Sequence, residues 1–127
     1  KPPLIFGSGN QTRDFTHVFD TVAGMILAAN SDRINNGEII NIARGEEVSI
    51  NNLSKYLLEE LKSNLKPEYH SPRPADVMRH YADISKAKRI LGFQPKIDIR
   101  MGIKLYLEWL ERQNIDFSKE TEVNWIR

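Results

Sequence analysis

Two arginines stand where an anion-binding side chain would be held in place. Arg13 lies beside Asp14 in a run of residues typical of a β-strand. Arg73 lies between Pro72 and Pro74. Because proline restricts its own backbone and that of the residue before it, the direction of the Arg73 side chain is limited. A guanidinium group held in one direction is suited to bidentate recognition of a phosphate or a carboxylate.

An acidic residue follows the second arginine closely. Asp76 stands three residues after Arg73, so both side chains could contact one ligand. Since a carboxylate accepts hydrogen bonds from hydroxyl groups, Arg13, Arg73 and Asp76 predict a ligand that carries an anion with hydroxyls beside it, as a nucleotide does. The alternative is structural. Arg73 would then pair with Asp76, and Arg13 would pair with Asp14 or Asp20.

Residues 4–10 contain a second, weaker candidate for phosphate binding. An apolar run leads into two glycines at positions 7 and 9, and backbone amides freed by glycine can hold a phosphate. A dinucleotide fingerprint requires a third glycine, whose place Thr12 takes, and a helix directly after the loop. Because residues 12–19 are typical of a strand, we interpret the glycine segment as a plain turn between two strands.

The sequence contains no complete set of catalytic residues. Without cysteine there is no thiol nucleophile and no thiolate metal site. The histidines at positions 17, 70 and 80 do not stand at metal-ligand spacing. Glu46 and Glu47 look like solvated charges of a turn rather than an acid and base pair. No tyrosine precedes a lysine by four positions.

Hydrophobic spacing predicts the first two helices. Residues 21–30 place apolar side chains on one helical face, with Asp20 in the N-cap position. Ser49 is the predicted N-cap of a second helix that extends to about residue 63, because its hydroxyl can accept a hydrogen bond from a free backbone N–H.

Two more helices and several short strands are predicted. The third helix begins at Asp83 and ends at Gly92, where glycine permits a left-handed backbone. Asp98 caps the last helix. Runs rich in β-branched and aromatic residues predict the strands. These runs are residues 4–6, 12–19, 38–43 and 77–83.

Composition describes one globular domain of ordinary size. The chain has 127 residues, a net charge of +1 and 40% hydrophobic residues, enough to bury a core. We expect no membrane span and no secretory leader, and the lack of cysteine favours a cytoplasmic protein. The balanced charge disfavours nucleic acid as a partner. The opening at Lys1 reads as the middle of a longer protein.

Three segments carry a resemblance to a known family. They are PLIFGSGNQTRDFTHVFD from Pro3, GEIINIARGEEVSI from Gly37 and RPADVMRHYADISKAKRILGFQPKIDIRMGI from Arg73. In this order they resemble the C-terminal half of the extended short-chain dehydrogenases/reductases that act on nucleotide sugars with NAD, the epimerases and dehydratases. They are most similar to UDP-glucose 4-epimerases. The resemblance extends from Pro3 to about Leu110.

The resemblance implies a role for each of the three charged residues. Arg13 and Arg73 are implied to grip the pyrophosphate of a nucleoside diphosphate sugar, while Asp76 hydrogen-bonds the ribose. These implied roles agree with the recognition of an anion and hydroxyls that the residues themselves predict.

The resemblance also implies how the rest of the nucleotide is held. The backbone around Leu4 and Phe6 would hold the edge of uracil. Phe15 and Ile50 would line the nucleotide pocket.

The family's other functional parts lie N-terminal to the matched segment. These are an NAD-binding Rossmann half and a Tyr-x-x-x-Lys base, and neither is in this sequence. Residues 1–127 are therefore expected to form a single C-terminal substrate-binding domain, an α+β lobe of a few short strands and about four helices within a larger α/β enzyme. By itself the lobe is expected to be inactive.

The function implied is part of an NAD-dependent 4-epimerase. The lobe would anchor the pyrophosphate of a UDP-hexose while the sugar is oxidised and re-reduced at C4, and the intact enzyme would be a homodimer. Two alternatives stay open. One is a dehydratase or decarboxylase of the same family, and the other is a stand-alone nucleotide-binding module without catalysis.

Overall fold

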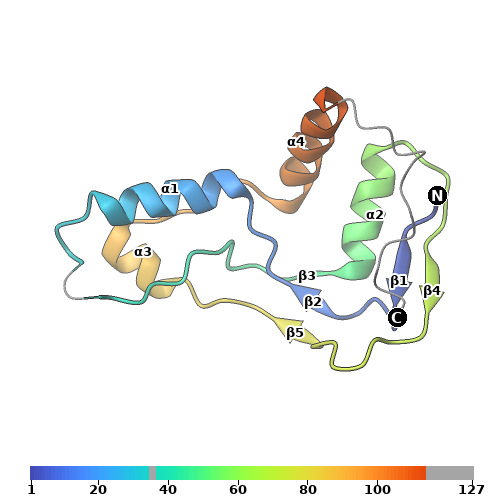
Figure 1. Ribbon diagram of the computed structural model, residues 1–127, viewed down its shortest axis with the longest axis horizontal. Coiled ribbons are helices and arrows are strands. Elements are labelled where there is room, and N and C mark those ends of the chain that lie inside the picture. Colours follow the sequence, from blue (N-terminus) through green and yellow to red (C-terminus); the bar gives the residue numbers. More distant parts are fainter. Residues whose placement is uncertain (35–36, 114–127) are drawn as a thin grey trace.

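The computed structural model describes residues 1–34 and 37–113. Within these ranges it contains four helices and five short strands, which confirms the α+β lobe (Figure 1). In chain order the elements are β1 (Leu4–Phe6), β2 (Thr12–Arg13), α1 (Val18–Ala29), β3 (Val48–Ser49), α2 (Ile50–Glu60), β4 (Glu68–His70), β5 (Arg79–His80), α3 (Ser85–Leu91) and α4 (Ile99–Arg112). No helix in the described part of the chain is both long and apolar enough to span a membrane.

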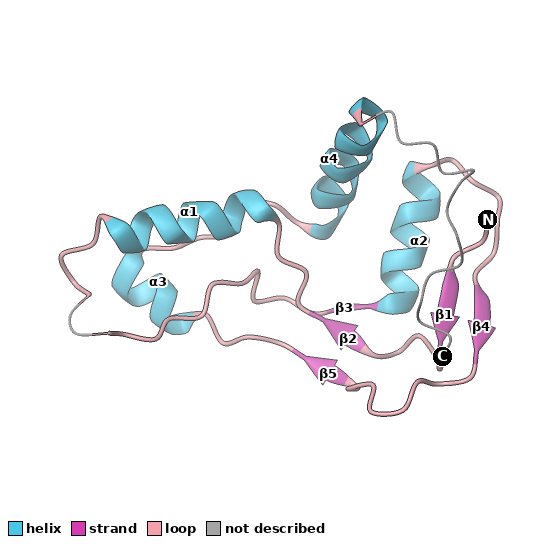
Figure 2. Ribbon diagram, viewed as in Figure 1, coloured by secondary structure: helices cyan, strands magenta, loops and turns pink. Residues whose placement is uncertain are grey.

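The strands form two small sheets. β1 pairs with β4 in parallel, with Ile5 opposite Tyr69. β2 lies between β3 and β5, antiparallel to the first and parallel to the second. Figure 2 shows β2, β3 and β5 below α2, and β1 and β4 beside α2 at the right-hand end, with α1 and α3 at the opposite end of the molecule. Segments far apart in sequence thus lie side by side in two strand pairs, β1 with β4 and β2 with β5.

Local signals set three helix ends as predicted. The Ser49 hydroxyl accepts a hydrogen bond from the Asn52 N–H at 3.1 Å, and the Asp98 carboxylate accepts one from the Met101 N–H at 2.8 Å. α3 ends at Gly92, which has a left-handed φ of 64°. α2 ends at Glu60 rather than near residue 63.

Asp20 is not the N-cap of the first helix, contrary to the prediction. His17 takes that position, and the strand-like run 12–19 is a strand only at residues 12–13. Asp20 lies inside α1 with 4% of its surface exposed, and its two oxygens accept hydrogen bonds from the backbone N–H groups of Lys96 and Ile97, each at 2.9 Å. This carboxylate therefore joins α1 to the segment before α4, a contact that local spacing could not predict.

Residues 38–43 do not form the predicted strand. The apolar side chains of this run are nevertheless used for packing, since Ala43 is buried in the main hydrophobic core and the β-branched Ile40 and Ile42 are packed against it. Such side chains indicate burial, whereas a strand also requires a neighbouring strand with free backbone groups. In the described part of the chain no strand pairs with these residues.

The main core lies at the end of the molecule formed by α1 and α3. Its buried residues are Ala43, Ile84, Ala87, Leu91 and Phe93. Phe93 is 1% exposed, and its backbone N–H donates back to the Ala87 carbonyl at 3.3 Å. The turn at Gly92 therefore places a large aromatic side chain in the centre of this core.

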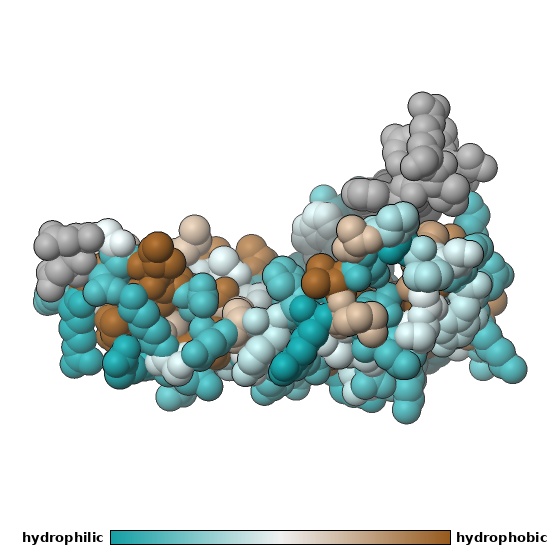
Figure 3. Space-filling model, turned by 90° about the horizontal axis from the view of Figure 1, so that it is seen from below, coloured by the Kyte–Doolittle hydropathy of each residue, from teal (hydrophilic) through white to brown (hydrophobic). Residues whose placement is uncertain are grey.

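One face of α1 is apolar and exposed. Phe19, Met25 and Ile26 on this face have 62%, 64% and 55% of their surface exposed. Outside the helix, the side chain of Ile39 is also exposed, at 83%. Figure 3 shows hydrophobic surface gathered towards the α1 and α3 end of the molecule. An exposed apolar face of this kind marks an interaction surface in most proteins.

Candidate functional site

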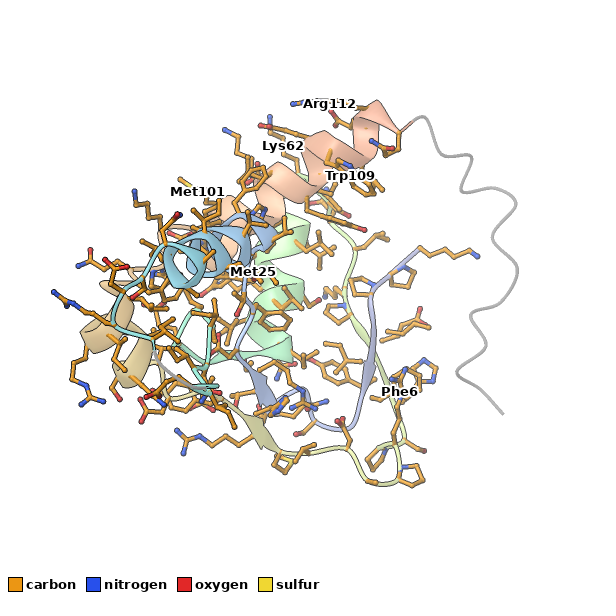
Figure 4. The ribbon with its side chains drawn as sticks, turned by 60° about the vertical axis from the view of Figure 1, so that its left-hand side comes forward. Phe6, Met25, Lys62, Met101, Trp109 and Arg112 are labelled. Atoms are coloured by element: carbon orange, nitrogen blue, oxygen red, sulfur yellow. The ribbon has the colours of Figure 1, made fainter. Side chains whose placement is uncertain are left out.

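A groove opens beside the carboxyl end of β1. Its volume is about 560 Å³, and its walls come from β1, the loop after it and the segment that follows β4. The lining residues are Phe6, Gly7, Ser8, Gln11, His70, Pro72, Arg73, Asp76 and Met78. Figure 4 shows Phe6 far from Met25 of α1 and from Trp109 and Arg112 of α4. The groove thus contains three of the predicted site residues: Phe6, Arg73 and Asp76.

A tight turn brings Arg73 and Asp76 to this groove together. The Asp76 N–H lies 3.3 Å from the Arg73 carbonyl, and Ala75 between them has a positive φ of 62°. Proline in the second position and a positive φ in the third are the features of a type II turn. A left-handed backbone at alanine costs about 1–2 kcal/mol, so the surrounding contacts hold this turn against some strain.

Arg13 on β2 contacts Asp76, one of the residues that line this groove. Its Nη2 lies 2.5 Å from Asp76 Oδ1, and its Nη1 donates to the carbonyls of Thr12 and Val77 at 2.7 and 2.6 Å. The Arg13 and Asp76 side chains keep 24% and 31% of their surface exposed. The ion pair therefore joins two predicted site residues. The structural alternative predicted that Arg13 would pair with Asp14 or Asp20, whereas its partner is Asp76.

Asp14 turns away from its neighbour Arg13. Its two carboxylate oxygens accept hydrogen bonds from the backbone N–H groups of Arg44 and Gly45, each at 3.0 Å. Successive side chains of an extended segment point to opposite sides. The two adjacent charges thus make contacts on opposite sides of the segment: Arg13 with Asp76, and Asp14 with the loop at residues 44–45.

The Arg73 guanidinium lies over an aromatic ring. Its central carbon is 4.0 Å from the centre of the Phe6 ring, a distance at which a cation is attracted to the ring face. The Phe6 ring in turn lies 5.6 Å from the ring of His70. Arg73 therefore forms part of the wall of the groove, beside Phe6.

The backbone of β1 offers hydrogen-bonding groups on the edge that faces away from β4. One of them, the Phe6 carbonyl, accepts a hydrogen bond from the Gln11 side-chain amide at 2.7 Å. The Pro3 carbonyl accepts a hydrogen bond from the Glu68 N–H, and the Gly7 N–H donates to the His70 carbonyl, each at 2.9 Å. Both bonds connect β1 to β4. In a parallel ladder alternate residues face opposite edges, so the N–H and C=O groups of Leu4 and Phe6 face away from β4. No other strand pairs with β1 within residues 1–34 and 37–113.

The two remaining predicted residues, Ile50 and Phe15, do not line this groove. Ile50 is the first residue of α2, and its N–H donates to the Gln11 carbonyl at 3.1 Å. Phe15 lines a different groove of about 300 Å³, together with Ile103 and Tyr106. The structure therefore groups Phe6, Arg13, Arg73 and Asp76 tightly, and places Phe15 elsewhere.

The glycine segment after β1 is the plain turn that the sequence predicted. It leads into β2 rather than into a helix. Gly9 has a φ of 73°, and a Cβ added there would lie 2.0 Å from Asn51 Oδ1. The Asn51 amide donates to the Ser8 carbonyl at 3.1 Å. This turn is filled by a side chain of α2, so it does not form a phosphate cradle.

Gln11 is among the groove residues that were not predicted from the sequence. It is a polar residue with only 7% of its surface exposed, and it stands two positions before Arg13. Its amide contacts both Phe6 and Asp76. A lone glutamine in a turn carries no sequence signal of burial, because burial here depends on the return of the chain after β4.

The prediction that Glu47 is a solvated charge of a turn is wrong, because its carboxylate is hydrogen-bonded to two other side chains. Glu47 lies next to β3 and accepts hydrogen bonds from Thr12 on β2 at 2.7 Å and from Arg79 on β5 at 2.8 Å and 2.6 Å. The Arg79 hydrogen bonds, followed by that of Thr12, lower the pKa of Glu47 from 4.5 to about 2. The cluster connects all three strands of the sheet that carries Arg13.

This cluster predicts acid sensitivity of the sheet. Because the pKa of Glu47 is lowered on folding, the stability that its charge contributes is fully present above pH 4.5 and is lost as the pH falls towards 2. Glu47→Gln should lower the thermal midpoint at pH 7 and flatten its decline between these pH values. Calorimetric scans from pH 7 to pH 2 measure this, with Glu46→Gln as the control. Equal pH profiles for Glu47→Gln and the unaltered protein would contradict it.

Comparison with known proteins identifies relatives over most of this chain. A family model described as GDP-mannose 4,6 dehydratase matches residues 1–106. A putative UDP-glucose 4-epimerase of Methanocaldococcus jannaschii is 40% identical over 112 residues, which are 88% of this chain and 35% of that protein. UDP-glucuronic acid decarboxylase 4 of Arabidopsis thaliana is 32% identical over 85% of this chain and 24% of its own length.

Solved structures agree with these sequence matches. The UDP-glucuronic acid 4-epimerase of Bacillus cereus, in complex with UDP-glucuronic acid and NAD, superimposes with a TM-score of 0.82 at 30% identity. The match covers 89% of this chain and 36% of that one. The chain thus spans about a third of the length of the epimerases to which it is similar.

Proposed function

Because this chain belongs to the nucleotide-sugar epimerase and dehydratase family of extended short-chain dehydrogenases/reductases, we propose that it is the substrate-binding lobe of an NAD-dependent UDP-hexose 4-epimerase. The observation that carries the proposal is that Arg73 and Asp76 line one groove and that Arg13 forms an ion pair with Asp76, although Arg13 and Asp76 are 63 positions apart. Two guanidinium groups and a carboxylate suit a diphosphate with a ribose beside it.

The edge of β1 that faces away from β4 supports a base with the donor and acceptor pattern of uracil. The Leu4 carbonyl is an acceptor and the Phe6 N–H is a donor on the same edge. Uracil presents a complementary N–H donor and carbonyl acceptor on its pairing edge. Cytosine presents the reverse order, and would place donor against donor and acceptor against acceptor. Leu4 and Phe6 therefore fit a keto pyrimidine.

The role proposed for this lobe is anchoring. Epimerisation requires that the sugar present both faces of C4 to the reacting groups while the nucleotide stays bound. Contacts to the remote diphosphate retain the oxidised intermediate and orient it. Arg13 and Arg73 are the proposed anchors, Asp76 the proposed ribose ligand, and Ile50 and Phe15 proposed walls of the wider nucleotide cleft.

NAD is not assigned to the residues described here. Gly9 is occluded by Asn51, and no helix follows the glycine turn, so this segment does not fit a dinucleotide phosphate. We propose that the hydride transfer at C4 takes place on NAD held by an N-terminal Rossmann half. The exposed apolar face of α1 supports such a second body, because it offers Phe19, Met25 and Ile26 to a partner surface. We also propose that the intact enzyme is a homodimer in the cytoplasm.

The Arg73 contact gives a direct test in the full-length protein. Arg73→Ala should weaken UDP binding by about 1.5–3 kcal/mol, because a hydrogen bond to a charged group is lost. Titration calorimetry with UDP measures the change. Arg89→Ala, which removes a charge from α3 away from the groove, is the control and should leave the affinity unchanged. Unchanged UDP affinity in Arg73→Ala would remove Arg73 from the site.

A decarboxylase is the second candidate function. The Arabidopsis relative supports it, since it is named a UDP-glucuronic acid decarboxylase. The anchor for the nucleotide would be the same in both enzymes. Product analysis of the full-length protein with UDP-glucose and UDP-glucuronic acid separates the two, because only decarboxylation releases carbon dioxide.

A further inference from the structure

The buried amide of Gln11 joins two parts of the groove. Its Nε2 donates to the Phe6 carbonyl at 2.7 Å and lies 3.4 Å from Asp76 Oδ2. Gln11 is 7% exposed, and burying an amide is costly unless it is hydrogen-bonded. One side chain thus connects the strand edge proposed for the base with the carboxylate proposed for the ribose.

Asp76 is held at both of its oxygens. Arg13 Nη2 contacts Oδ1 at 2.5 Å, while the Gln11 amide faces Oδ2. An ionised carboxylate has about four acceptor positions, so these two contacts leave about two. Two remaining acceptors on an oriented carboxylate match the two neighbouring hydroxyls of a ribose diol.

We propose that Gln11 is a positioning residue that orients the Asp76 carboxylate, and thereby sets the preference of the groove for a ribose diol. This inference rests on the proposed function. Arg13 alone fixes one oxygen of Asp76 and leaves the carboxylate free to rotate about that contact. The second donor removes this freedom, and its own position is fixed by the short bond to Phe6.

The test compares two ligands in the full-length protein. Dissociation constants of UDP and 2′,3′-dideoxy-UDP are measured by calorimetry, and their ratio reports recognition of the diol alone. The unaltered protein should prefer UDP. Gln11→Met, which keeps the size but removes both donors, should reduce this preference by about threefold to tenfold, the effect of one hydrogen bond.

A matched variant separates positioning from mere stability. Asn51 holds the same loop through the Ser8 carbonyl but does not line the groove. Asn51→Ala should lower the thermal midpoint and leave the ligand ratio unchanged. Gln11→Glu keeps the volume of the side chain and places a second carboxylate against Asp76, so it should also reduce the ratio.

The outcomes are distinct. If Gln11→Met weakens both ligands by the same factor, Gln11 has only a structural role and the inference is overturned. Failure of both Gln11 variants to fold leads to the same conclusion. If the unaltered protein binds neither ligand, the proposed function itself fails. A reduced ratio in both Gln11 variants with an unchanged ratio in Asn51→Ala supports the inference.

Discussion

Arg13→Ala is expected to weaken UDP binding by the full-length enzyme by about 2–4 kcal/mol, or about 30-fold to 1,000-fold. This is more than the loss expected for Arg73. The reason is the ion pair at 2.5 Å between Arg13 and Asp76. Without Arg13 the diphosphate loses a cation and also meets the uncompensated carboxylate of Asp76. Titration calorimetry at constant ionic strength measures the loss.

A second variant distinguishes these two contributions. Adding Asp76→Asn to Arg13→Ala removes the uncompensated negative charge, so the double variant should bind UDP more tightly than Arg13→Ala alone. Asp76→Asn alone should still bind UDP more weakly than the unaltered protein, because the ribose loses a charged acceptor. Additive losses in the double variant would show that Arg13 and Asp76 do not interact when the ligand binds.

Phe93→Ala is expected to lower the free energy of unfolding by about 3–5 kcal/mol, since it leaves a large cavity in the main core. Phe93 is 1% exposed and packs with Ile84 and Leu91. Hydrogen exchange of the α3 amides in the full-length protein measures this loss locally. Phe93→Leu, which fills part of the space, is the matched control and should lose less. Equal losses in both variants would show that the core does not depend on the volume of this side chain.

The core around Phe93 is also connected to the groove by a series of contacts. Asp14 connects the Arg13 segment to the loop at residues 44–45, and Ala43 at the start of that loop is a core residue. Loosening the core should therefore reach β2 through a defined chain of contacts. UDP affinity of Phe93→Leu, measured beside its stability, reports how strongly the two ends are coupled.

Features determined by the sequence alone are those that depend on neighbouring residues. Ser49 and Asp98 cap their helices because a short polar side chain reaches a free N–H three residues ahead. Gly92 ends α3 because glycine tolerates a left-handed backbone. The same local logic identified the glycine segment as a turn, and the order of three segments indicated the family.

Other features were decided only by the tertiary structure. Asp20 appeared to be a cap and is instead bonded to residues 96 and 97, while residues 38–43 pack without forming a strand. Which carboxylate neutralises Arg13 depended on the return of the chain after β4, because β2 and β5 pair across more than sixty positions. Gln11 and Glu47 became bound side chains for the same reason. Burial and charge pairing depend on contacts between distant segments, whereas caps and turns are complete within a few residues.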